Sequence, residues 1–122
     1  MSKSLKVFLC IAAFSLLLFC CYTLYNYSIL SLRVKFADDQ TLIFDEAANQ
    51  AMQGSPQEAI KCLEYVISYY PSGSKQELGS SLDILVERAR ANTIKIIIDH
   101  LRSETKLDLG NSPKAWIDHY TR

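Results

Sequence analysis

The chain has 122 residues and a mass of 13.8 kDa, and its thirteen basic and thirteen acidic residues cancel. That length holds one small domain, and the balanced charge excludes a general polyanion binder, so we expect no nucleic-acid partner. Four glycines and three prolines also exclude collagen-like and low-complexity chains.

The most apolar part of the sequence is a run without charged residues from Val7 to Leu32. A helix rises 1.5 Å per residue, so about 20 residues cross a hydrocarbon core of about 30 Å. We therefore expect residues 1–32 to be an N-terminal anchor whose transmembrane helix spans about residues 7–29 and contacts the lipid bilayer. Tyrosines near the end of the run are typical of a membrane interface: Tyr22, Tyr25 and Tyr27.

Two alternatives to an uncleaved anchor are a cleaved signal peptide and a lipidated cysteine. Lys3 and Lys6 would form the basic region of a signal peptide, but the apolar run exceeds the usual length of about 7–15 residues. No cleavage site of small residues follows the run. A lipoprotein-type Cys20 would follow Phe19, which is bulkier than the small residue expected there. The pattern therefore favours the anchor.

The basic residues that flank the run indicate an orientation. Lys3, Lys6 and the α-amino group precede it, whereas Arg33 and Lys35 follow it. By the positive-inside rule this difference favours an N-terminus in the cytoplasm and a C-terminal domain outside it.

The four cysteines indicate neither a disulfide framework nor a metal site. Cys10, Cys20 and Cys21 lie in the apolar run, and only Cys62 belongs to the remaining part of the chain. A lone cysteine forms no internal disulfide, and no Cys-x-x-Cys pair is present to hold zinc. We expect no cofactor and no metal.

The chain after the anchor has the pattern of an all-α domain covering residues 38–122, preceded at 33–37 by a linker or a continuation of the membrane helix. Ser55-Pro-Gln-Glu58 is the clearest start signal, with serine at the N-cap, proline at N1 and glutamate at N3. Asp38 and Asp39 are expected to cap the preceding helix. Apolar spacing and caps predict four helices, at about 38–53, 56–70, 81–103 and 113–120.

The long helix predicted at 81–103 carries two apolar faces. We expect the wider face to pack in the core, with its members being Leu82, Leu85, Val86, Ala89, Ile96, Ile97 and His100. The other is a candidate partner-binding face, made of Ile84, Ala91, Ile94 and Ile98. Trp116 on the last helix should close the end of the bundle, where its burial contributes about 3 kcal/mol.

Charge is unevenly distributed after the anchor. Residues 36–64 hold six acids and one base, a net charge of −5, whereas residues 65–122 hold eight bases and seven acids, a net charge of +1. The first pair of helices therefore forms an acidic hairpin, which is typical of a solvated surface.

Two resemblances follow from these motifs. Ala59, Leu63 and Pro71 stand where a tetratricopeptide repeat has its second-helix alanine, its apolar residue and its closing proline, so the hairpin is similar to one such unit without forming an array. Tyr69-Tyr-Pro-Ser-Gly-Ser-Lys-Gln76 and the ending Leu109-Gly-x-x-Pro-x-x-Trp116 resemble a group of small, membrane-anchored, all-helical bacterial proteins of unknown function. Where those proteins carry Thr-Gly, this chain has Thr105-Lys106. The resemblance implies a bacterial inner-membrane protein and brings no catalytic residue.

The leading hypothesis for function is a membrane-tethered structural or protein-interaction module that binds a protein partner or forms a homo-oligomer. No phosphate-binding glycine loop or recognisable catalytic motif is present. The alternative is a small membrane-bound hydrolase or metal-dependent enzyme that uses His100 with Asp99 or Cys62.

Overall fold

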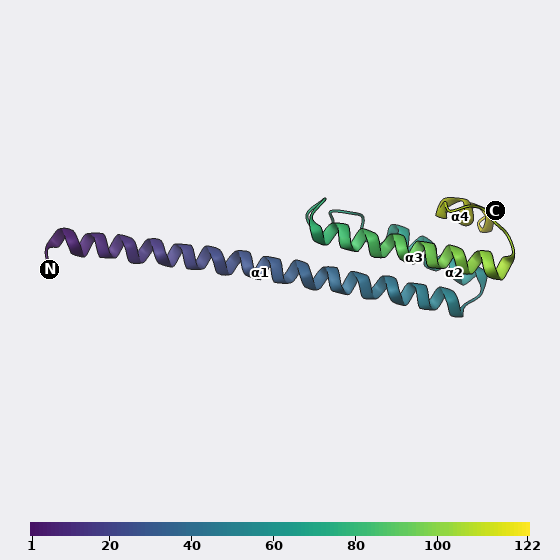
Figure 1. The fold of residues 1–122 in the computed structure, drawn as a ribbon, viewed down its shortest axis with the longest axis horizontal. Helices are drawn as coiled ribbons and strands as arrows, with labels where there is room; N and C mark the ends of the chain where they lie inside the picture. The colour runs from purple at the N-terminus through teal and green to yellow at the C-terminus, as the bar shows by residue number, and fades with distance from the viewer. The chain divides into compact units, whose positions relative to one another are not determined.

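The computed structural model describes all 122 residues and contains four α-helices and no strand. The chain divides into two compact units, Met1–Val34 and Lys35–Arg122. The first is an apolar helical segment, and the second is a small helical bundle, the helical domain (Figure 1). The predicted all-α architecture is confirmed.

The first helix, α1, runs without a break over Lys3–Gln53. Residues 33–37 therefore continue the helix, and the predicted helix start at Asp38 is wrong. No glycine or proline lies between Lys3 and Gln53, so nothing in the backbone chemistry ends the helix there. Asp38 is an interior residue whose carbonyl accepts a hydrogen bond from Thr41 Oγ1 at 2.8 Å.

The Met1–Val34 unit consists of one apolar helical segment with no buried side chain along its whole length. Phe19, for example, is 63% exposed. By its length and composition α1 is a candidate membrane span. The polar side chains of the segment bind carbonyls of the preceding turn: Thr23 Oγ1 donates to Cys20 at 2.9 Å and Ser28 Oγ donates to Leu24 at 2.9 Å. These hydrogen bonds satisfy the hydroxyl groups without water.

The second helix, α2, covers Pro56–Ser68 and begins with the predicted capping box. Glu58 N donates to Ser55 Oγ at 3.3 Å, and Ser55 N donates to Glu58 Oε2 at 2.7 Å. The helix ends two residues before the predicted Tyr70, because Tyr69 is extended and Tyr70 has a left-handed φ of 37°.

Two further helices complete the domain, α3 over Ser81–Thr105 and α4 over Pro113–Tyr120. The side chain of Ser80 caps α3 by accepting a hydrogen bond from Asp83 N at 3.2 Å. Lys106 ends α3 in the left-handed conformation, with a φ of 57°. Glycine adopts such a φ without strain, whereas a lysine with a Cβ does not.

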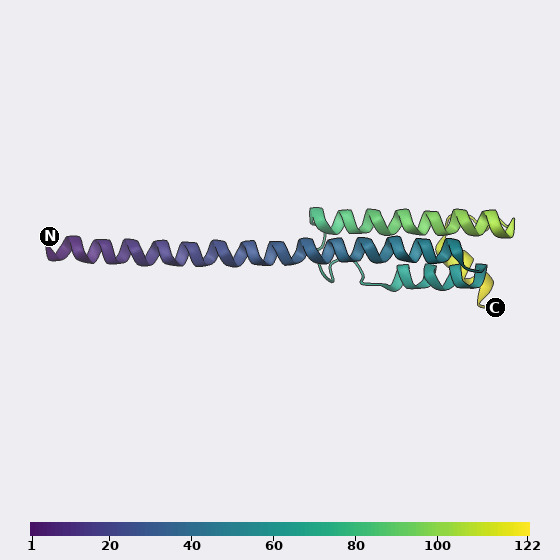
Figure 2. The same ribbon diagram turned by 90° about the horizontal axis from the view of Figure 1, so that it is seen from below.

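The core of the helical domain lies between the C-terminal part of α1, α2 and α3, which run side by side in the domain (Figure 2). Fully buried side chains come from every helix: Phe44, Ala51, Ala59, Leu63, Val66, Ile97, Leu101 and Trp116. Trp116 has no exposed surface, and its Nε1 donates to the Gly110 carbonyl at 2.9 Å, as expected of a side chain that closes the bundle.

The core-facing side of α3 differs from the predicted stripe. Val86 and Ile97 are buried, but Leu85 is 56% exposed and His100 is only half-buried. Polar residues occupy core-facing positions in their place: Asp83, Arg90 and Thr93. A prediction from apolar spacing takes only apolar residues into account. Because polar residues are also buried here, the side of α3 that faces the core differs from the predicted one.

Candidate functional site

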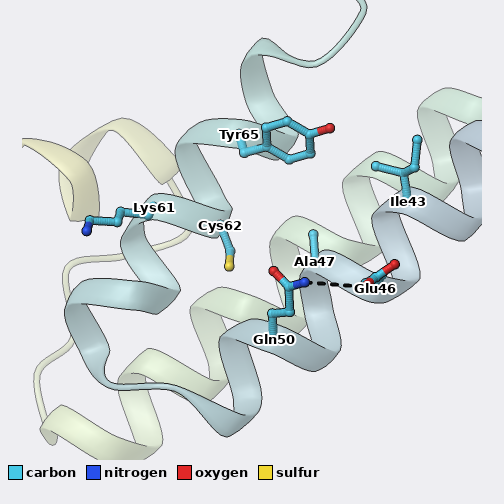
Figure 3. Close-up of a pocket in the computed structure, with 7 residues that line it drawn as sticks. All are labelled: Ile43, Glu46, Ala47, Gln50, Lys61, Cys62 and Tyr65. Atoms are coloured by element: carbon cyan, nitrogen blue, oxygen red, sulfur yellow. Dashed lines mark hydrogen bonds between the residues drawn. The ribbon is translucent and has the colours of Figure 1, made fainter.

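A groove lies between α1 and α2 in the helical domain (Figure 3). It encloses ≈ 410 Å³ and is lined by Ile43, Glu46, Ala47, Gln50, Lys61, Cys62 and Tyr65. Cys62 points toward α1 and Lys61 points away from it. Gln50 Nε2 donates to Glu46 Oε1 at 3.3 Å, so an amide and a carboxylate form one wall.

A second cavity of ≈ 440 Å³ lies next to the groove, and Ile43 lines both. Its other lining residues are Phe36, Asp39, Gln40, Leu42, Tyr69, Tyr70 and Lys75. Gln40 is 4% exposed, and its Oε1 has no hydrogen-bond partner. An unpaired buried acceptor lowers the stability of the fold. Two carboxylates, of Asp39 and Glu46, and two lysines, Lys61 and Lys75, line the cavities. We call the two cavities together the acidic groove, after the acidic hairpin of residues 36–64 that forms most of it.

Aromatic side chains and one lysine cover the end of the acidic groove. Lys75 Nζ lies 4.6 Å from the ring centroid of Tyr70 and 5.1 Å from that of Phe36. The Tyr69 ring contacts Phe44 at 6.0 Å and Tyr70 at 4.6 Å between centroids. Burial, and then the neighbouring tyrosines and Asp39, raises the pKa of Tyr69 above its ordinary value.

Buried charges on α3 hold the loop that carries Tyr70 and Lys75. Asp83 accepts hydrogen bonds from Ser72 Oγ at 2.6 Å, Gly79 N at 2.9 Å and Gly73 N at 3.1 Å. These bonds, from the Ser72 hydroxyl first, hold the pKa of Asp83 below its ordinary value, because they favour the carboxylate.

Arg90 fixes the start of the same loop. Its Nη2 donates to the Tyr69 carbonyl at 2.6 Å and also to the Tyr70 carbonyl. Carbonyls at a helix C-terminus lack intrahelical donors, so the guanidinium caps α2 from another helix. The sequence analysis missed this role. The feature of the sequence that could have indicated it is a pair of opposite charges, Asp83 and Arg90, two helical turns apart on one side of α3.

The candidate partner-binding face on α3 divides into exposed and packed residues. Ile84 is 45% exposed and Ala91 is exposed, whereas Ile94 is half-buried and Ile98 is 2% exposed in the core. The last three line a shallow cavity of ≈ 250 Å³ together with Lys95, Asp99 and Asn111.

The exposed side of α3, opposite the core, has a different composition from the predicted face. We call it the α3 outer stripe, and its members, all exposed, are Ile84, Leu85, Arg88, Ala91, Asn92 and Lys95. Two aliphatic side chains lie at one end of the stripe. The short side chains of Ala91 and Asn92 lie in its middle, with a basic residue on either side of them.

The residues of the alternative enzymatic hypothesis do not share a site. The Asp99 carboxylate is paired with Arg102 Nη1 at 2.8 Å, and His100 is half-buried on α3. Cys62 lines the acidic groove, where His100 does not. Burial, followed by the charge of Glu58, raises the pKa of Cys62, which opposes formation of a nucleophilic thiolate. No group of three or more His, Cys, Asp or Glu side chains could hold a metal ion.

Compared with known proteins, the chain matches no protein family, no curated protein and no solved structure. The resemblance to small membrane-anchored bacterial proteins therefore stays a prediction. The candidate sites rest on the geometry of this chain alone.

Proposed function

We propose that this chain is a single-pass membrane protein, anchored through residues 7–29, whose helical domain binds proteins. One observation carries the proposal: the apolar side chains of the Met1–Val34 unit are left unburied by the chain, while the helical domain closes its own core. Exposing such a continuous apolar surface to water is strongly unfavourable, whereas a bilayer accepts it.

The interaction role is supported by the surface of the helical domain. The acidic groove combines exposed Leu42 and Tyr65 with two carboxylates and two lysines. The α3 outer stripe adds a second surface that carries both aliphatic and basic side chains. Aromatic and aliphatic groups with polar surroundings are typical of protein-binding surfaces.

The flanking charges support an orientation with the helical domain outside the cytoplasm. The further proposal of a bacterial inner membrane rests only on the resemblance to small membrane-anchored bacterial proteins. Lys3, Lys6 and the α-amino group favour a cytoplasmic N-terminus. Digestion of spheroplasts with an added protease tests this placement. We expect the helical domain to be degraded without lysis, and a protected domain would reverse the orientation.

Alkaline carbonate extraction of membranes tests the anchoring. We expect the full chain to remain in the membrane pellet after the wash, because only integral proteins resist it. A chain that begins at Lys35 is the matched control and should remain in the supernatant. Release of the full chain by carbonate would contradict the proposal.

A further inference from the structure

We propose that the acidic groove binds the α3 outer stripe of a second copy of this chain. This inference rests on the proposed interaction function and names its partner. Charge, apolar surface and register on the two surfaces all support it.

The α3 outer stripe is the basic surface of the pair. Arg88 and Lys95 are exposed, and neither makes an ion pair within the chain. Ile84 and Leu85, about half exposed, lie at one end of the stripe. Large aliphatic groups beside unpaired cations on the solvent side of a helix are suited to an acidic, partly apolar partner.

Each cavity of the acidic groove has one carboxylate that can meet a base of this stripe. Each is also lined by a lysine, but Lys61 points away from α1 and Lys75 lies over the rings of Tyr70 and Phe36. Asp39 and Glu46, one in each cavity, are exposed and make no ion pair within the chain. Ile43 lies between them and lines both cavities. Leu42 and Tyr65, which are 59% and 47% exposed, add apolar surface that a partner would cover.

The charges on the two surfaces have the same spacing. Asp39 and Glu46 are seven residues apart on α1, and Arg88 and Lys95 are seven residues apart on α3. Seven residues are about two helical turns, so each pair spans about 10 Å on one side of its helix. Ile43 lies between the acids. The residues between the bases on the α3 outer stripe have short side chains, which permit close approach.

The register of the helices places these pairs at the same level. Within the helical domain α1 and α3 run in the same direction (Figure 1), and Thr93 Oγ1 donates to the Phe44 carbonyl at 3.4 Å. Those two residues are 49 positions apart. The same offset relates Arg88 to Asp39 and Lys95 to Glu46.

A second copy displaced sideways, without a shift along α1, would therefore meet each acid with a base. Anchoring in one bilayer confines the copies to two dimensions, which raises their effective concentration.

The contact uses two different surfaces of each copy and is therefore heterologous. Such contacts propagate into rings or open chains rather than stopping at a two-fold dimer. Each copy would offer its α3 outer stripe to one neighbour and its acidic groove to the other.

Charge reversal in the full chain, reconstituted into neutral lipid vesicles, tests the proposal. Association is measured by energy transfer between donor- and acceptor-labelled copies as the protein-to-lipid ratio is varied. We expect Glu46→Lys and Lys95→Glu each to weaken association about tenfold, because each places like charges opposite one another. The double variant Glu46→Lys/Lys95→Glu restores opposite charges, and we expect its association to return to within about threefold of the unmodified chain.

Glu64→Lys is the matched control, because it makes the same charge change on an exposed residue that lines neither cavity. It should leave association unchanged, and circular dichroism should show the same helicity for all variants. A monomeric wild type at every ratio, an unaffected Glu46→Lys variant, or a double variant as weak as the singles would overturn the proposal. Failure of the anchoring would appear separately, as release of the chain by carbonate.

Discussion

One helix, α1, runs through both units of the molecule, and its two parts differ in the burial of their side chains and in the arrangement of their apolar residues. Between Lys3 and Val34 apolar side chains lie on all sides of the helix, and no side chain is buried. From Ala37 onward the buried residues follow one face of the helix, at spacings of three or four residues with one adjacent pair of alanines: Ala37, Gln40, Phe44, Ala47, Ala48 and Ala51. A helix that is apolar all round suits lipid, whereas a helix with one apolar stripe suits a protein core.

The difference teaches that sequence periodicity, rather than helix propensity, decides where each part of α1 belongs. The small alanines of the stripe let α2 and α3 approach closely, and Phe44 fills the space between them. The first part has no such stripe, so its sequence specifies no single side for packing against other helices of the chain. The variants below test whether the two regions are energetically independent.

The largest expected effect is on the anchor. The double variant Ala13→Arg/Leu17→Arg places two charges near the middle of the predicted span, each at a cost of about 2.5–3.5 kcal/mol for insertion. We expect it to move from the carbonate-resistant pellet to the soluble fraction. Ala13→Leu/Leu17→Ala is the control and should stay in the membrane. Insertion of the arginine variant would contradict the assignment of residues 7–29.

Trp116→Ala is the opposite test, because it should damage only the helical domain. Removing a fully buried indole and its hydrogen bond to Gly110 should lower the free energy of unfolding by about 3–5 kcal/mol. Urea denaturation followed by circular dichroism measures the loss. Carbonate resistance should be unchanged. A loss below about 1 kcal/mol would show that α4 does not close the bundle.

Asp83→Asn tests whether the Asp83 carboxylate stabilises the domain through its hydrogen bonds to Ser72, Gly73 and Gly79. The test is the pH dependence of the free energy of unfolding. Because the pKa of Asp83 is lowered in the folded chain, its carboxylate stabilises the fold at neutral pH. That contribution is lost as the pH falls through the ordinary aspartate value, about 3.9, toward the lowered folded value. The stability difference between the unmodified chain and Asp83→Asn should therefore be largest near pH 7 and shrink below about pH 4. A stability difference independent of pH would show that the ionised Asp83 carboxylate does not stabilise the fold.

Two cap variants should have smaller effects of opposite sign. Ser55→Ala removes one half of the capping box and should destabilise the domain by about 1 kcal/mol. Lys106→Gly relieves a left-handed φ of 57° and should stabilise it by about 1 kcal/mol. Thermal denaturation in detergent compares both with the unmodified chain. A destabilised Lys106→Gly variant would show that the lysine side chain contributes more than the backbone strain removes.

The sequence predicted the class of the fold, the capping box at Ser55 and the burial of Trp116, because local chemistry and size determine these features. It left open whether residues 33–37 are a linker or a continuation of the helix, and it placed a helix start at Asp38. Two aspartates there resemble a helix cap, although neither glycine nor proline precedes them to end the helix. The core face of α3 was also missed. The hydrogen bonds that make Asp83 and Arg90 acceptable inside the domain come from residues as many as 21 positions away.

The candidate sites were less predictable than the fold. The sequence pointed to Ile84, Ala91, Ile94 and Ile98, yet half of these residues pack inward. The acidic groove is formed by residues on two helices and a loop, which only tertiary packing brings together. Its acidity was visible in the charge distribution of residues 36–64, but its shape was not.

The native cysteines offer the most direct test of a lipid-embedded segment joined to a water-exposed domain. Cys10, Cys20 and Cys21 lie in the apolar segment, and Cys62 lies in the helical domain. Full-length chain in vesicles is treated at pH 8 with a membrane-impermeant maleimide added to both faces, and the modified residues are identified by mass spectrometry. The account predicts that only Cys62 reacts until detergent dissolves the bilayer. Equal labelling of Cys10, Cys20 and Cys21 before detergent would contradict it.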